Sequence, residues 1–174
     1  PITLDAPAGS LIHTGGQILA NSLSATVKNG ITANLDVRTV SAAVTGSGDV
    51  NFVTSGAVTL ASVSVASGSV AVQGFGDITA QNITTSGGSG GISLTGLAGN
   101  LTLGNISAAG TLDVQSDVGA INSLPGSTVA AADVNYVGQF SPDFTLASDD
   151  VTLISRRPGD VVLNYTGTGP LTLR

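Results

Sequence analysis

The sequence predicts an all-β protein whose chain winds into a right-handed parallel β-helix (β-solenoid), a stack of short coils. Three observations lead to this prediction: the composition, the spacing of the apolar residues, and their alternation with small polar ones. The 174 residues include 24 Gly and no Glu, Cys, Met or Trp, and Lys28 is the single lysine. Because the chain lacks the residues that build solvent-facing helices, strands are expected throughout.

The stretch from residue 56 to residue 119 repeats one pattern three times. Glycines close the repeats at positions 56, 76, 99 and 119, so the spacings are 20, 23 and 20 residues. Three apolar columns keep this period: Val58 and Leu60 with Ile78 and Ala80 and with Leu101 and Leu103; Val63 with Ile83 and Ile106; and Val70 and Val72 with Ile92 and Leu94 and with Leu112 and Val114. The repeats differ in length only between the columns, which is where a stacked repeat tolerates insertions.

Each repeat is expected to form one coil of two or three short strands. Branched aliphatic residues alternate with Ser, Thr, Asp and Gln, the period of a strand with one buried face. One coil cannot bury that face alone, but a second coil stacked at the strand spacing of about 4.8 Å does so. Successive coils run in one direction, so the strands are expected to be parallel, with right-handed connections. The chain length then predicts about eight coils of 20–23 residues.

The period extends on both sides of this stretch. Residues 2–23 begin with short apolar strands around a turn at 13–16, and from Ile31 onward the rhythm is clear. After Leu124 it loosens, so residues 124–144 are expected to form a long turn or a lateral protrusion. Strands then resume at 144–146, 151–154, 161–163 and 171–173. We therefore expect a single β-helical segment over residues 1–174.

Charge and composition exclude several classes of function. The formal net charge of −6 repels phosphate backbones, so no nucleic-acid partner is expected. The absence of Cys excludes a disulfide framework and thiolate-bound metal. No apolar run reaches the length of a membrane-spanning helix, so no membrane insertion is expected. Nothing in the sequence calls for a cofactor.

Residues 100–114, Asn-Leu-Thr-Leu-Gly-Asn-Ile-Ser-Ala-Ala-Gly-Thr-Leu-Asp-Val, show the repeat most clearly. This unit resembles the repeats of filamentous haemagglutinin-type exoproteins, large bacterial adhesins secreted by the two-partner route. The resemblance covers residues 31–124 clearly, and it implies the right-handed β-helical shaft of that family. The secretion domain of the family carries Asn-Pro-Asn motifs, and this chain contains no Asn-Pro. The resemblance therefore implies a shaft or a later domain.

The expected function follows from the resemblance. It is a structural and adhesive shaft segment of a secreted or cell-surface bacterial adhesin, which presents loops to host or bacterial surface glycans or proteins, and is not an enzyme. The alternative is a carbohydrate-active β-helix, such as a polysaccharide lyase or hydrolase. The strand pattern runs to the last residue, and an uncapped solenoid end exposes unpaired backbone groups. We therefore expect the parent protein to continue beyond Arg174, or the ends to associate end to end.

The most concentrated charge lies near the irregular stretch and supplies the candidate ligand-binding residues. These are Phe140, Asp143, Asp149, Asp150, Arg156 and Arg157. In a lyase or hydrolase, carboxylates on neighbouring coils beside arginine would transfer a proton and stabilise developing charge. The aspartates and arginines in this set are also usual occupants of solvated turns, and this interpretation is favoured. A calcium site would use the same aspartates, but the chain has no calcium-loop motif, so neither a metal nor a catalytic site is predicted.

The remaining motifs are weaker signals. His13 is the single histidine, and a turn histidine is favoured because no Cys or Glu accompanies it. Four glycosylation sequons, at Asn82, Asn100, Asn105 and Asn164, are close to the number expected by chance. The outward residues are too mixed for the regular threonine array of an ice-binding surface.

Overall fold

The structure is a computed structural model that describes the backbone of residues 1–141, 143–155, 162–165, 168–173 and the side chains of residues 1–139, 148, 150–154 and 168–172. It confirms the all-β prediction: the described residues form 14 strands and no helix, in one parallel sheet. The sheet winds into a β-solenoid of about seven turns, rather than the eight expected. Within this part of the chain, no helix exists that could cross a membrane.

The strands differ in length because some follow a coil around its corner. The long strands are β2 (Leu11–Val27), β3 (Ile31–Ser47), β10 (Thr111–Ser123), β11 (Thr128–Ser141) and β12 (Asp143–Ser155). The shorter ones are β1 (Ile2–Ala6), β4 (Val50–Thr54), β5 (Val58–Ser67), β6 (Val70–Gly74), β7 (Ile78–Thr85), β8 (Ile92–Gly96), β9 (Leu101–Ser107), β13 (Val162–Tyr165) and β14 (Leu171–Leu173).

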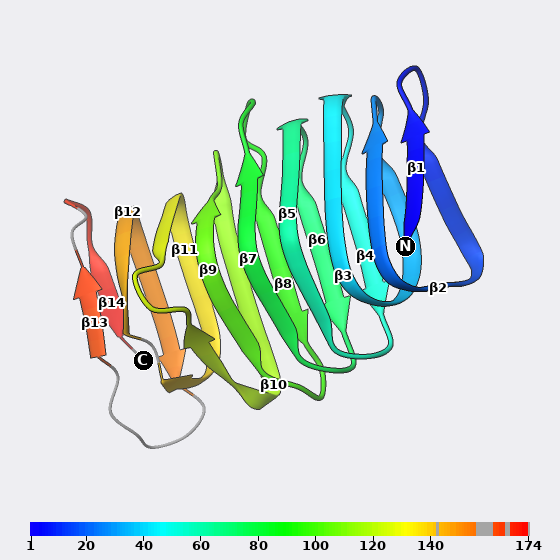
Figure 1. The fold of residues 1–174 in the computed structure, drawn as a ribbon. Helices are drawn as coiled ribbons and strands as arrows, with labels where there is room; N and C mark the ends of the chain where they lie inside the picture. Colours follow the sequence, from blue (N-terminus) through cyan, green and yellow to red (C-terminus); the bar gives the residue numbers. More distant parts are fainter. Residues whose placement is uncertain (142, 156–161, 166–167, 174) are drawn as a thin grey trace.

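The sheet order shows how the coils stack (Figure 1). Along one side of the solenoid the order is β3-β4-β6-β8-β10, and along another side β9, β7 and β5 lie next to one another. We call the surface formed by β4, β6, β8 and the parts of β2, β3 and β10 in register with them the first wall. The surface formed by β5, β7 and β9 is the second wall. Each middle coil supplies one strand to each wall, as β6 and β7 do.

The register between coils aligns the apolar residues in columns, as the sequence predicted. All three predicted columns pair in the expected positions, for example Val63 with Ile83 and Ile83 with Ile106. One column starts in the first wall and continues through β11, β12 and β14; its members are Leu11, Ile31, Val50, Val70, Ile92, Leu112, Val134, Val151 and Leu171. From Ile31 to Val151 its members are almost fully buried. The core is therefore a continuous aliphatic stack.

The repeated glycines lie where the backbones of successive coils approach closely. A Cβ atom on Gly99 would overlap the backbone of Gly76, and one on Gly119 would overlap the backbone of Gly99. No side chain fits between the coils at these positions. Steric contact therefore explains the glycines at positions 76, 99 and 119, whereas a Cβ atom on Gly56 would make only ordinary contact with Asp36.

Polar side chains join the coils at the turns. Asp49 Oδ1 accepts a hydrogen bond from the Ser69 backbone N–H (2.8 Å), and Asp77 Oδ1 accepts one from Asn100 N–H (2.7 Å). Asn100 Oδ1 in turn accepts from Ala120 N–H (2.9 Å) on the next coil. These bonds hold the turns in register where the sheet pairing ends.

Two regions contain more strand than the sequence indicated. Residues 13–16 lie within β2, whose pairing with β3 is irregular between His13 and Ile18. Residues 124–144, where a long turn or protrusion was expected, consist largely of β11 and the first residues of β12. The backbone at Phe140 pairs with Ile121 of β10, so hydrogen bonding to the preceding coil extends the strand through this stretch.

Candidate functional site

The structure describes only some of the residues of the predicted charged site. Phe140 lies in β11, and Asp143, Asp149 and Asp150 lie in β12. Of these four, only the side chain of Asp150 is described, and Arg156 and Arg157 lie outside the described residues. Whether these six residues form one ligand site therefore stays a prediction.

Asp150 has a carboxylate neighbour that the sequence analysis did not select. It is paired in register with Asp133 of β11, which places two acidic residues on adjacent coils. Asp133 is exposed and Asp150 is half-buried. In the part of the chain that the structure describes, no three histidine or acidic side chains lie close enough together to hold a metal ion. The sequence contained a signal for this pair: Asp133 and Asp150 are 17 residues apart, the same spacing as the apolar residues Val134 and Val151 that follow them.

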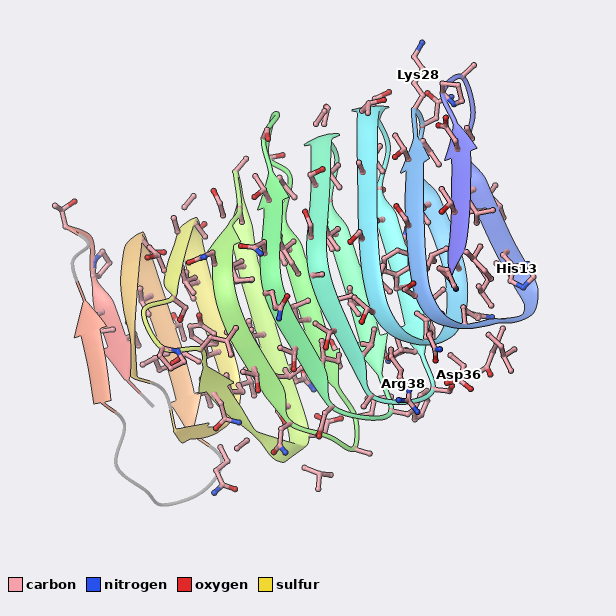
Figure 2. All side chains as sticks on the ribbon, viewed as in Figure 1. His13, Lys28, Asp36 and Arg38 are labelled. Carbon is pink, nitrogen blue, oxygen red and sulfur yellow. The ribbon has the colours of Figure 1, made fainter. Side chains whose placement is uncertain are left out.

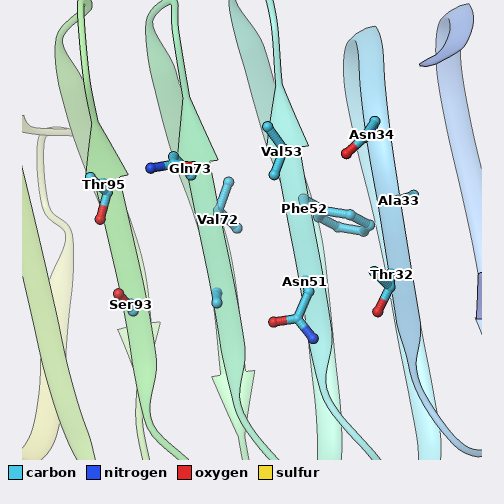
Figure 3. A pocket seen from close by; sticks show the side chains of 11 residues that line it. Thr32, Ala33, Asn34, Asn51, Phe52, Val53, Val72, Gln73, Ser93 and Thr95 are labelled. Atoms are coloured by element: carbon cyan, nitrogen blue, oxygen red, sulfur yellow. The ribbon is translucent and has the colours of Figure 1, made fainter. Parts of the chain in front are cut away.

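A hollow of about 250 Å³ lies on the outer surface of the first wall (Figure 3). Two outward-facing rows line it, each with one residue from β3, β4, β6 and β8. The first row is Thr32, Asn51, Ala71 and Ser93, and the second is Asn34, Val53, Gln73 and Thr95. Strand alternation directs these side chains away from the core, because their neighbours along each strand point inward. The short side chain of Ala71 leaves the centre of the array open.

The hollow offers uncharged hydrogen-bonding groups. None of its lining residues is charged. Asn34 Nδ2 donates to the Thr14 carbonyl oxygen over 3.4 Å. The amides of Asn51 and Gln73 are exposed and, among the described residues, make no hydrogen bond within the protein. These two amides are therefore available to a ligand as both donors and acceptors.

A second hollow, of about 270 Å³, adjoins the first and shares Thr32 and Asn51 with it. It reaches Ile12 of β2, whose side chain is 73% exposed. Together the two hollows form what we call the first-wall groove, which crosses β2, β3, β4, β6 and β8. Four strand spacings of about 4.8 Å give it a length of about 19 Å.

A further hollow lies at a corner of the solenoid and differs in chemistry. It has a volume of about 580 Å³ and contains Asp36, Arg38 and Asp77, so charges of both signs line it. Figure 2 shows Asp36 and Arg38 close together near the turns, away from His13. Phe75, which precedes Asp77 in the same turn, is 55% exposed. Charges of both signs therefore line this corner hollow, whereas the first-wall groove has one charged residue, Asp49 in its second hollow, and no exposed ring.

No protein-family model matches the chain, and none of the curated proteins or solved structures compared with it matches either.

Proposed function

We propose that this chain is a shaft segment of a large bacterial surface or secreted adhesin, which spans distance stiffly and contacts glycans or proteins along its length. The observation that supports this proposal is the column from Leu11 to Leu171, in which every coil places an apolar residue at the same position. A stack with one repeated cross-section is a spacer whose length is set by the number of coils.

The direction of the hydrogen bonds makes the stack stiff. In parallel strands, backbone hydrogen bonds run from each coil to the next, so they lie along the axis of the solenoid. Tension along that axis is distributed over all the bonds between two neighbouring coils. The aliphatic column beneath the strands adds contact between the same coils.

Side chains add further links along the axis. Asn82 Nδ2 donates to the Ala61 carbonyl oxygen one coil earlier (3.0 Å), and Thr45 Oγ1 donates to the Val27 carbonyl oxygen (3.2 Å). Such bonds resist sliding of one coil over another. The resemblance of residues 100–114 to adhesin repeats supports the same function, with a location on the cell surface or outside the cell.

Antibody labelling of the source bacterium tests this proposal. Fab fragments raised against the chain should label intact cells or detect the protein in the culture medium. They should also reduce attachment of the cells to a glycan-bearing surface. Fab fragments against an abundant cytosolic protein provide the control for leakage. Labelling that appears only after the cells are permeabilised would contradict the proposal.

A further inference from the structure

We propose that the first-wall groove binds a neutral polysaccharide chain, laid across the strands from β2 to β8. This inference deepens the adhesive role proposed above and rests on it for its biological setting. It names the surface and the ligand class, which the shaft architecture alone does not specify.

The chemistry of the groove selects a neutral, polyhydroxylated ligand. Asn51 and Gln73 present free amides, and Ser93 and Thr95 present hydroxyl groups beside them (Figure 3). Amides and hydroxyls both donate and accept hydrogen bonds, as sugar hydroxyls do. In the hollow around Ala71 no cation is present to pair with an acidic sugar. The negative charge of the whole chain opposes acidic sugars further.

The floor of the groove is apolar and suits the C–H face of a sugar ring. The methyl groups of Ala71 and Val53 lie within the array of amides, and Val53 is exposed. They offer apolar contact to the C–H groups of a pyranose ring while the rim binds its hydroxyls. No aromatic ring is exposed in the groove, so the affinity of one site is expected to be in the millimolar range.

The shape of the groove selects a chain rather than a single sugar. The two hollows join at Thr32 and Asn51, and the groove repeats similar groups on successive strands. A ligand about 19 Å long contacts every strand from β2 to β8. Because similar groups recur on successive strands of the groove, one polysaccharide makes several weak contacts at once and binds more tightly than a single sugar.

Nuclear magnetic resonance titration of the whole chain tests the inference. The probes are the neutral hexasaccharides cellohexaose, maltohexaose, xylohexaose and chitohexaose, with hexagalacturonate as the anionic comparison. At least one neutral hexasaccharide should shift the side-chain amide signals of Asn51 and Gln73 in a saturable manner. The side-chain amide of Gln81, exposed on β7 of the second wall, should not shift.

Two variants locate the site. Gln73→Leu removes one free amide, and Ala71→Ile fills the hollow without adding charge; each should weaken binding about tenfold or more. Gln81→Leu is the matched control and should leave binding unchanged. Backbone amide spectra verify that each variant is folded. If a variant fails to fold, the titration of the unsubstituted chain still shows whether the side-chain amides of Asn51 and Gln73 respond to the sugar.

The outcomes separate this inference from the shaft function. No shift with any neutral hexasaccharide, binding of hexagalacturonate alone, or equal shifts at Gln81 would overturn the groove as a neutral-glycan site. If Fab fragments against the chain label intact cells but the chain binds no neutral sugar, the shaft function stands and this inference is wrong. A chain that binds the sugar in the groove but is confined to the cytosol overturns the shaft function alone.

Discussion

Asn105 Nδ2 donates a hydrogen bond to Asn82 Oδ1, which lies directly beneath it on the preceding coil at a distance of 3.5 Å. The pair belongs to a ladder: Asn82 Nδ2 donates to the Ala61 carbonyl oxygen, and Asn105 Oδ1 accepts from Thr128 N–H (3.1 Å). Four successive coils are thus joined by two asparagines. Both residues are also sequon asparagines, and their amide nitrogens already serve as donors within the protein.

Replacing Asn82 tests the strength of this ladder. Asn82→Ala removes the donor to Ala61 and the acceptor for Asn105, and should lower the free energy of unfolding by about 1 kcal/mol. Asn51→Ala is the control, because the Asn51 amide makes no hydrogen bond within the described part of the protein. Urea unfolding monitored by circular dichroism measures both. Equal effects of the two substitutions would show that the ladder does not stabilise the stack.

Thr85 provides a second test of inter-coil bonding, now inside the solenoid. Its buried Oγ1 donates to the Gly90 carbonyl oxygen (2.7 Å) and accepts from Ala109 N–H (3.0 Å). Thr85→Val keeps the shape but leaves both backbone groups without this partner, which should cost about 1–3 kcal/mol. Thr84→Val, at the exposed neighbouring position, should change the unfolding free energy by less than about 0.5 kcal/mol. A stability of Thr85→Val equal to that of Thr84→Val would refute the prediction.

The glycine column predicts a strong dependence on position. A Cβ atom on Gly99 meets the backbone of Gly76 and the Asp77 N–H, which cannot move aside as a side chain can. Gly99→Ala should therefore lower the free energy of unfolding by about 3 kcal/mol. Gly15→Ala is the control, because nothing lies within 4 Å of a Cβ atom there. Thermal or urea unfolding distinguishes the two, and a Gly99→Ala protein as stable as Gly15→Ala would contradict the close approach.

The buried Tyr136 predicts a loss of stability at alkaline pH. Its side chain is 0% exposed, and burial raises the pKa of its phenol well above the usual value of about 10. Above pH 10 the unfolded chain releases this proton and the folded chain keeps it. The contribution of Tyr136 protonation to the free energy of unfolding is therefore fully present below pH 10. Above pH 10 it declines by about 1.4 kcal/mol per pH unit.

The substitution Tyr136→Phe isolates this effect. The variant should lose the part of the alkaline slope that Tyr136 causes, whatever its stability at pH 7. Urea unfolding from pH 8 to pH 11.5 measures the slopes of the two proteins. Parallel slopes over that range would mean that Tyr136 ionises in the folded state as readily as in the unfolded chain.

The sequence predicted the stacked columns because burial imposes them directly. An inward position such as Ile83 must be apolar in every coil, so both the period and the facing of each strand appear in the residue order. Gly99 and Gly119 are constrained in the same way by the neighbouring backbone. These features recur along the chain, and their recurrence allowed them to be predicted from the sequence.

The surface sites could not be predicted in this way. The hollow around Ala71 depends on the relative sizes of outward residues on four strands, and outward positions carry no burial constraint. The neighbour of Asp150 depends on the register of β11 with β12, where the offset falls to 17 residues from the 20–23 of the central repeats. The stretch at 124–144 was expected to be a long turn or a protrusion because its pattern is irregular, yet pairing with the adjacent coil makes most of it strand.

Removal of one coil tests the central claim that each coil adds a fixed increment to a stiff spacer. Ser24, Ser41, Ser62, Asn82, Asn105 and Thr128 occupy equivalent positions on successive coils. Because the chain has no Cys, spin labels can be attached to cysteines introduced by Ser24→Cys and Thr128→Cys. Five strand spacings of about 4.8 Å separate these positions, about 24 Å in all.

Deleting residues 62–81 joins Ala61 to Asn82 and removes one 20-residue period while keeping the inward and outward alternation. Double electron–electron resonance should show one narrow distance distribution before and after the deletion, with the mean shortened by about 5 Å. An unchanged mean, or a broad distribution from an unfolded chain, would contradict the account of this protein as a stack of interchangeable coils.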